Sequence, residues 1–236
     1  MRKLWPLFLL PALLLPELAL DPFQGALSPN LQHWLGTDPL GRDALLRLLY
    51  VAGRAGGFAS ACAVGSLSLA WLVALTSAPI HSALSALRTT PSLLWLIPVA
   101  ALLGGLGTLP MGLLITLMLV PHMEAPLRVK GRGLRQSPAW AMGRLQGAHP
   151  LHRAWIWVPW AAREASALFP SAWLGALWTA ITLSALGLGP GPQTDTFGRL
   201  LMEDLPRILS GAAVAWAALV LLMALAWSLS FPEPSP

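Results

Sequence analysis

The 236-residue chain has few charged residues, a single cysteine and a single tyrosine. Only 11% of its residues are charged, whereas a soluble domain has about 25%. This shortage of charge argues against a soluble enzyme, a disordered chain and a nucleic-acid-binding protein. Because Cys62 has no second cysteine, it can form neither an internal disulfide nor a cysteine-based metal site.

The motifs of common enzyme classes are also missing. The sequence contains no G-x-x-x-x-G-K-[ST], H-E-x-x-H or G-x-S-x-G, and its only lysines are Lys3 and Lys130. A P-loop needs a lysine after its glycine-rich turn, so the chain has no P-loop of its own. Of the five histidines only His149 and His152 are close in sequence, and we interpret them as solvated or interfacial. We expect no catalytic residue, and no metal or other cofactor bound by this chain.

What the sequence does have is long apolar runs, since 56% of its residues are hydrophobic. A helix needs roughly 20 apolar residues to cross the bilayer core. We therefore expect an all-α integral membrane protein with about six transmembrane helices. The expected spans are residues 4–20, 57–78, 89–106, 109–122, 166–188 and 208–230, with glycines and a proline at 104–110 separating the third from the fourth. Residues 4–20 are similar to a signal peptide, but 15–21 lack a clear small-x-small cleavage site, which favours an uncleaved first helix.

Loop charge predicts the orientation. Residues 123–165 contain two acids and seven bases: Arg128, Lys130, Arg132, Arg135, Arg144, Arg153 and Arg163. The positive-inside rule places this segment in the cytoplasm, and six spans then place both termini there. The charged residues Glu17, Arg88 and Glu124 lie near the ends of expected spans, where long side chains can reach the interface. We therefore expect no ion-coupled carrier, which would need acids or histidines near the middle of the membrane.

Residues 33–50 (HWLGTDPLGRDALLRLLY) combine a turn with a helix start. Asp38 can bond to nearby backbone N–H groups in the turn 37–41. Asp43 can cap the amphipathic stretch 44–54. Arg42 and Asp43 can pair with a partner or with each other. Composition alone is equally compatible with an ordinary turn followed by a surface helix.

The same segment closely resembles a pattern found after the first helix of permease subunits in dipeptide, oligopeptide and nickel ABC importers, H-x-L-G-T-D-x-L-G-R-D-x-x-x-R-x-x-Y. The matching residues are Leu35, Gly36, Thr37, Asp38, Leu40, Gly41, Arg42, Asp43, Arg47 and Tyr50. Residues 91–104 and 183–201 are similar to further parts of that family. The resemblance implies a type I ABC importer permease (MetI-like) fold in the bacterial inner membrane. Residues 1–56 would hold the first helix and an extracytoplasmic loop, and 57–236 the permease domain.

We call residues 139–159 the coupling segment. Its composition favours two short helices joined at Gly147, with Pro150 able to start the second, and taken alone it is compatible with a helix pair lying on anionic lipid. The family carries here an E-A-A-x-x-x-G…I-x-L-P loop that docks into a cytoplasmic ATPase. The candidate coupling residues are Ala141, Gly143, Arg144, Gln146, Gly147, Ala148, His149 and Pro150. The stretch 141–143 departs from the family pattern, since Ala-Met-Gly stands in place of Glu-Ala-Ala.

The resemblance implies a non-catalytic transport subunit. Its partners would be a second homologous permease, two cytoplasmic ABC ATPases that bind ATP and magnesium, an extracytoplasmic substrate-binding protein and membrane lipid, without nucleic acid. Peptides are the commonest cargo among such permeases. Nickel, metal chelates and haem stay open as alternatives, and the departure at 141–143 leaves open a degenerate, non-transporting membrane subunit.

Overall fold

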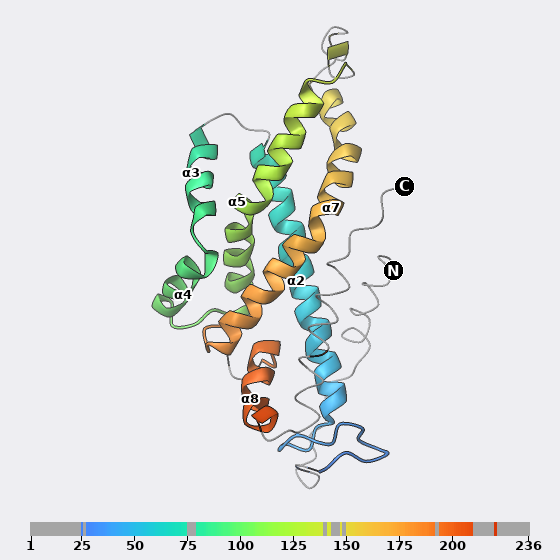
Figure 1. Ribbon diagram of the computed structural model, residues 1–236, viewed down its shortest axis with the longest axis vertical. Helices are drawn as coiled ribbons and strands as arrows, with labels where there is room; N and C mark the ends of the chain where they lie inside the picture. Colours follow the sequence, from blue (N-terminus) through green and yellow to red (C-terminus); the bar gives the residue numbers. More distant parts are fainter. Residues whose placement is uncertain are drawn as a thin grey trace. The chain divides into compact units, whose positions relative to one another are not determined.

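The computed structural model describes residues 25, 27–74, 79–138, 141–142, 147, 150–191, 194–209 and 220. These residues form six helices and no strand (Figure 1). The helices are α2 (Ala44–Ala74), α3 (Pro79–Thr89), α4 (Ser92–Leu102), α5 (Thr108–Arg135), α7 (Pro150–Ala185) and α8 (Phe197–Leu209). The predicted all-α architecture is confirmed for the described part of the chain.

Among the described residues, three segments are long and apolar enough to cross a membrane: Ala44–Ala74, Thr108–Gly133 and Ala162–Ala185. At about 1.5 Å per residue, even the shortest of them exceeds the roughly 30 Å of a hydrocarbon core. These helices are those of a membrane protein, and they overlap the spans expected at 57–78, 109–122 and 166–188. The expected span 4–20 lies outside the described residues, as does nearly all of 208–230.

The third expected span, 89–106, is shorter than predicted. α4 has 11 residues, which gives a length of about 17 Å and is too little to cross the bilayer core alone. It is separated from α3 at Pro91, because a proline disfavours helical geometry in the residue before it. It ends at Gly104 and Gly105, whose φ angles of 68° and 98° are left-handed. The break predicted at 104–110 is therefore confirmed, and the helix that ends before it, α4, is shorter than the expected span.

The long helices extend past the ends that hydropathy predicts. α2 begins directly after Asp43, whose Oδ1 accepts a hydrogen bond of 2.9 Å from the Leu46 N–H, so the predicted cap is confirmed. The stretch 44–54 and the expected span at 57 form one helix, with Gly53 and Gly56 buried inside it. α5 continues to Arg135 and α7 starts at Pro150. Much of the segment 123–165, expected as a loop, is consequently helical.

The chain divides into two compact units. Unit 1 comprises Met1–Ala59, Ala100–Met111 and Leu177–Pro236, and unit 2 comprises Ser60–Val99 and Gly112–Ala176. In unit 1 the core contains Val51, Leu106, Leu183, Phe197 and Leu200, all at most 4% exposed. The Leu106 N–H donates a 3.1 Å hydrogen bond to the Leu188 carbonyl, which joins the segment before α5 to the turn after α7.

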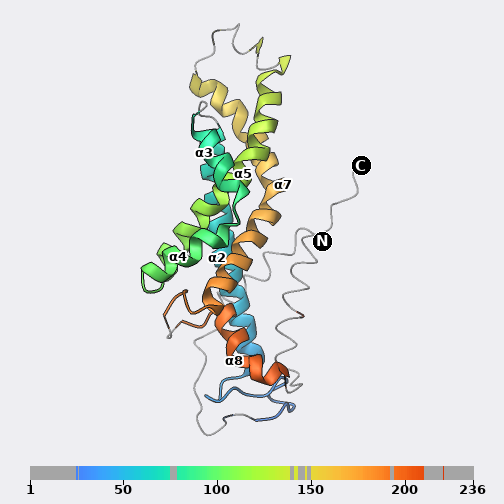
Figure 2. The same ribbon diagram turned by 60° about the vertical axis from the view of Figure 1, so that its left-hand side comes forward.

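Unit 2 is packed through small residues. A Cβ added to Gly65 would lie 3.1 Å from Thr116, and one added to Gly175 would lie 3.1 Å from Leu119. Such contacts let helices approach closely, as is common in membrane proteins. α3 lies next to α5 in this unit (Figure 2). α5 itself contains two prolines, Pro121 and Pro126.

The outer side of α4 is apolar. Leu94, Trp95, Val99 and Leu102 are all exposed. A helix that exposes several large apolar side chains is suited to contact with lipid or with another protein rather than with water. α4 is thus short but membrane-compatible.

Candidate functional site

The turn before α2 forms as the sequence predicts. Asp38 Oδ1 accepts hydrogen bonds of 2.9 Å from the N–H groups of Leu40 and Arg42. Thr37 and Leu27 bond reciprocally, because the Thr37 N–H donates to the Leu27 carbonyl and Thr37 Oγ1 accepts from the Leu27 N–H. Gly36 has a φ of 78°, and a Cβ there would lie 2.4 Å from the Leu27 carbonyl oxygen. The family-like segment therefore folds into a closed turn that no larger residue at 36 would permit.

Three arginines and three carboxylates of unit 1 form what we call the charged network. Its members are Asp38, Arg42, Arg47, Asp195, Arg199 and Glu203. Arg42 binds Asp38 through Nε at 2.7 Å and Asp195 through Nη1 at 2.8 Å. Arg47 uses Nη2 to bind Asp195 at 2.8 Å and Glu203 at 2.7 Å. The network thus joins the start of α2 to the start of α8.

The network is partly buried and electrically balanced. Asp38 is 4% and Arg47 5% exposed, and the three positive charges match the three negative ones. Burial alone would raise the pKa of Asp195, but the hydrogen bond from Arg47 and the charges of Arg47, Arg42 and Arg199 hold it below its ordinary value. Glu203 likewise has a lowered pKa, because Arg47 and Arg199 outweigh its burial. Both carboxylates are therefore ionised at neutral pH.

Of the two pairings predicted for Arg42 and Asp43, the structure excludes the one with each other. The two side chains do not pair with each other: Arg42 binds Asp38 and Asp195, while Asp43 Oδ2 lies 2.9 Å from His33 Nδ1. Sequence reasoning missed Asp195 and Glu203, because they follow Arg42 and Arg47 by about 150 positions. The one available signal was that the segment 189–207 carries three acids.

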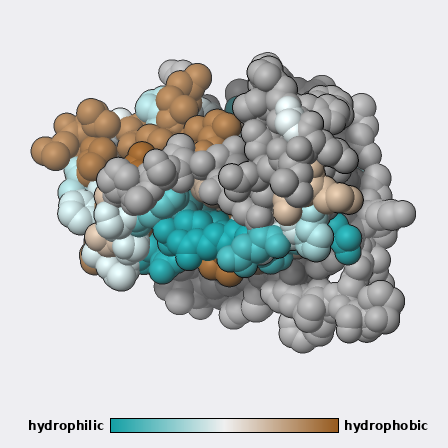
Figure 3. Space-filling model, turned by 90° about the horizontal axis from the view of Figure 1, so that it is seen from above, coloured by the Kyte–Doolittle hydropathy of each residue, from teal (hydrophilic) through white to brown (hydrophobic). Residues whose placement is uncertain are grey.

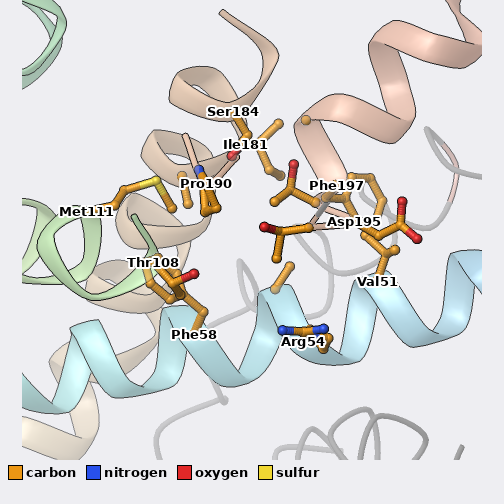
Figure 4. A pocket seen from close by; sticks show the side chains of 15 residues that line it. Val51, Arg54, Phe58, Thr108, Met111, Ile181, Ser184, Pro190, Asp195 and Phe197 are labelled. Atoms are coloured by element: carbon orange, nitrogen blue, oxygen red, sulfur yellow. The ribbon is translucent and has the colours of Figure 1, made fainter. Parts of the chain in front are cut away.

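A pocket lies beside the network in unit 1 (Figure 4). Its walls come from α2, the start of α5, the end of α7 and the segment leading into α8. They are mainly apolar, with Val51, Phe58, Met111, Ile181 and Phe197 among the lining residues. Two charged residues, Arg54 and Asp195, also line it, and its volume is about 80 Å³. The pocket has room for a small molecule or for one end of a larger one.

Unit 2 buries a separate cluster around Glu124, which is only 1% exposed. Glu124 Oε1 lies 2.9 Å from His81 Nδ1 on α3 and 3.2 Å from Arg128 Nε on α5. The expectation that Glu124 reaches a membrane interface is wrong, because protein covers its carboxylate. A hydropathy window detects a charge but not the neighbouring helix that pairs with it. The exposed Arg88 remains compatible with the expectation.

Replacing Glu124 with glutamine is expected to lower the free energy of unfolding by about 1–3 kcal/mol, because the ion pairs of a buried carboxylate with His81 and Arg128 are lost while the volume is kept. The measurement is unfolding of the purified protein in mixed micelles. Glu164→Gln is the matched control: Glu164 pairs with Lys130, whose side chain is 44% exposed, and this change is expected to cost at most about 1 kcal/mol. Equal losses in the two variants would contradict the structural role given to Glu124.

The basic end of unit 2 carries Arg128, Lys130 and Arg132 on α5 and Arg163 on α7. Figure 3, which views Figure 1 from above, shows hydrophilic side chains gathered on this face, beside a hydrophobic group on the side of α3 and α4.

Of the candidate coupling residues, Ala141 is helical, Gly147 forms a turn with a φ of 66°, and Pro150 starts α7. The predicted helix start at Pro150 is confirmed, but the helix that begins there is not short, since α7 has 36 residues. The residues on both sides of Gly147 lie outside the described part of the chain, so the joint there stays a prediction. Gly143, Arg144, Gln146, Ala148 and His149 lie outside the described residues.

In the part of the chain that the structure describes, no three His, Cys, Asp or Glu side chains are grouped so that they could hold a metal ion. Comparison with known proteins adds no assignment, since neither a protein-family model nor a curated protein sequence matches this chain.

Proposed function

We propose that this chain is the permease subunit of an ATP-driven ABC importer, and that with a second homologous permease it forms a path for peptides across the bacterial inner membrane. The observation that carries the proposal is the contiguous family-like segment 33–50. Its matched polar residues Asp38, Arg42 and Arg47 belong to the charged network, which gives that pattern a physical reason. The three span-length helices support the same proposal.

In the proposed mechanism the chain makes and breaks no covalent bonds. Two ATPase subunits bind ATP and magnesium and close, and their motion reaches this chain through the coupling segment. The helices then alternate between inward-open and outward-open arrangements. Such coupling is a free-energy linkage between the ATPase contact and the substrate path, and it requires a bundle with two discrete arrangements.

The charged network has a defined part in this proposal. On the proposed topology the charged network lies at the extracytoplasmic end, where it joins the start of α2 to the start of α8. Because its ion pairs are charge-assisted and partly buried, we expect them to keep that end rigid when the opposite end is pushed. The substrate-binding protein would meet this side, and the basic coupling segment would face the ATPases.

The proposal is tested by expressing the chain with its neighbouring transport genes and purifying it through a tag. We expect two ATPases and a second permease to copurify, and uptake of labelled peptide to disappear when the gene is deleted. Loss of nickel uptake alone would overturn the peptide assignment and favour the metal alternative. Copurification without any uptake would indicate the non-transporting subunit, and absence of ATPases from the complex would contradict the importer altogether.

The coupling segment gives a sharper prediction. Proline cannot adopt the φ of 66° at Gly147, so Gly147→Pro should displace the joint before α7. ATP hydrolysis by the complex should persist while peptide uptake falls about tenfold or more, the size of a typical coupling energy. Arg144→Glu is expected to act in the same direction. Gly133→Ala is the control, because a Cβ there meets nothing within 4 Å. Unchanged uptake in the Gly147 variant would remove the coupling assignment.

A further inference from the structure

Arg54 stands apart from the other described charges of unit 1. The charged network balances three arginines with three carboxylates, and Asp43 pairs with His33. Arg54 takes part in none of these pairs, and among the described residues no carboxylate contacts it. It is nevertheless one of the residues that line the pocket. The pocket therefore has a positive charge available to a ligand.

The guanidinium of Arg54 is held in place by its own helix. Nη1 donates a 2.9 Å hydrogen bond to the Tyr50 hydroxyl, one turn earlier in α2. The guanidinium carbon also lies 5.4 Å from the centre of the Tyr50 ring. A guanidinium has five N–H donors, so one bond to tyrosine leaves donors for a planar anion. Tyr50 thus positions the guanidinium and leaves several of its N–H donors available to a ligand.

Asp195 does not cancel this charge, although it also lines the pocket. Its two carboxylate oxygens accept hydrogen bonds from Arg42 and Arg47. In Figure 4 its carboxylate points away from Arg54 and from the middle of the pocket. The carboxylate that could repel an incoming anion is therefore already neutralised.

The remaining walls favour an apolar group. Val51, Phe58, Met111, Ile181 and Phe197 come from separate segments and converge on the pocket (Figure 4). Mostly apolar walls with a few fixed polar groups are typical of small-molecule sites, in which the polar group sets orientation. A volume of about 80 Å³ suits a side chain and its attached carboxylate better than a whole oligopeptide.

We infer that this pocket binds the carboxylate end of a small apolar molecule, with Arg54 as the group that recognises the anion. The C-terminal residue of a short peptide has this chemistry, and that identification rests on the proposed importer function. The guanidinium would hold the two carboxylate oxygens by a fork of N–H donors, while the apolar side chain fills the space between Phe58 and Phe197.

The test uses the full chain in detergent micelles and two matched probes, N-acetyl-leucine and its uncharged amide, N-acetyl-leucinamide. Binding is measured by calorimetry at low and high salt. We expect the acid to bind about tenfold more tightly than the amide, as a charge-assisted hydrogen bond implies. Salt should reduce this preference, because Arg54 is exposed. Arg54→Gln should abolish it and Arg54→Lys should retain part of it. Arg88→Gln, on exposed α3, should leave it unchanged.

Equal binding of the acid and the amide, no binding of either, or an unchanged preference in Arg54→Gln would each overturn the inference. The Arg54 variants should elute as the parent protein does and keep its helical circular dichroism, so that lost binding is not lost folding. We expect copurification with ATPases to be independent of Arg54, because the proposed ATPase contact is the coupling segment. An acid preference without ATPase partners would contradict the importer alone, and ATPase partners without an acid preference would contradict this site alone.

Discussion

Replacing Arg47 with methionine is expected to cause the largest loss of stability of any change considered, about 3–5 kcal/mol in the free energy of unfolding. Arg47 is 5% exposed and contacts three carboxylates, those of Asp38, Asp195 and Glu203. Without it, Asp38 and Asp195 share only Arg42, and buried negative charge is left uncompensated. Unfolding of the purified chain in mixed micelles measures the loss.

Two variants separate the loss of this charge from the loss of any surface arginine. Arg47→Lys keeps the charge but not the forked geometry, and should recover part of the stability. Arg199→Met removes a pair in which both side chains are more than a third exposed, so it should cost at most about 1 kcal/mol. If Arg47→Met were no more harmful than Arg199→Met, the network would not be holding α2 to α8.

Replacing Gly198 with alanine is expected to cost about 3 kcal/mol, the upper part of the range for overpacking. A Cβ at this position would lie 2.2 Å from the Ile181 carbonyl oxygen and 2.6 Å from the Ala185 nitrogen. Both are backbone atoms of α7, so no side-chain rotation relieves the clash and α8 must move away. We expect a lower unfolding midpoint and faster proteolytic cleavage between α7 and α8.

The control for this change lies in the connection that precedes α8. A Cβ at Gly191 meets nothing within 4 Å, and the φ of Gly191 is not left-handed. Gly191→Ala should therefore leave the unfolding midpoint unchanged. If both alanine variants behaved alike, close contact between α7 and α8 at Gly198 would be refuted.

Local features of this fold could be predicted because their causes are local. The cap at Asp43, the turn around Asp38 and the helix ends near Gly104 and Gly187 each depend on a residue and its immediate neighbours. Backbone donors next to a short carboxylate, and glycines with left-handed φ, act within a few positions of the chain. The sequence shows such causes directly.

What the sequence did not reveal depends on pairs that are distant in the chain. The expected span 57–78 begins after the charged residues Arg47 and Arg54, because hydropathy alone marks only the apolar stretch. The helix α2 nevertheless includes both arginines in its first turns. Both lie in the stretch 44–54 that the sequence predicts as a helix, but their partners were not predicted: Arg47 pairs with Asp195 and Glu203, and Arg54 bonds to Tyr50. The burial of Glu124 was missed for the same reason, since its partner His81 lies on another helix.

The two prolines of α5 lie on either side of Glu124, which contacts His81 on α3. Each proline lacks an N–H, so Pro121 and Pro126 leave the carbonyls of Leu117 and His122 without their usual helical donors. Bending α5 therefore costs least around these positions. Glu124 lies between them and is held to α3 by His81. Bending α5 at these prolines would therefore strain the contact between Glu124 and His81.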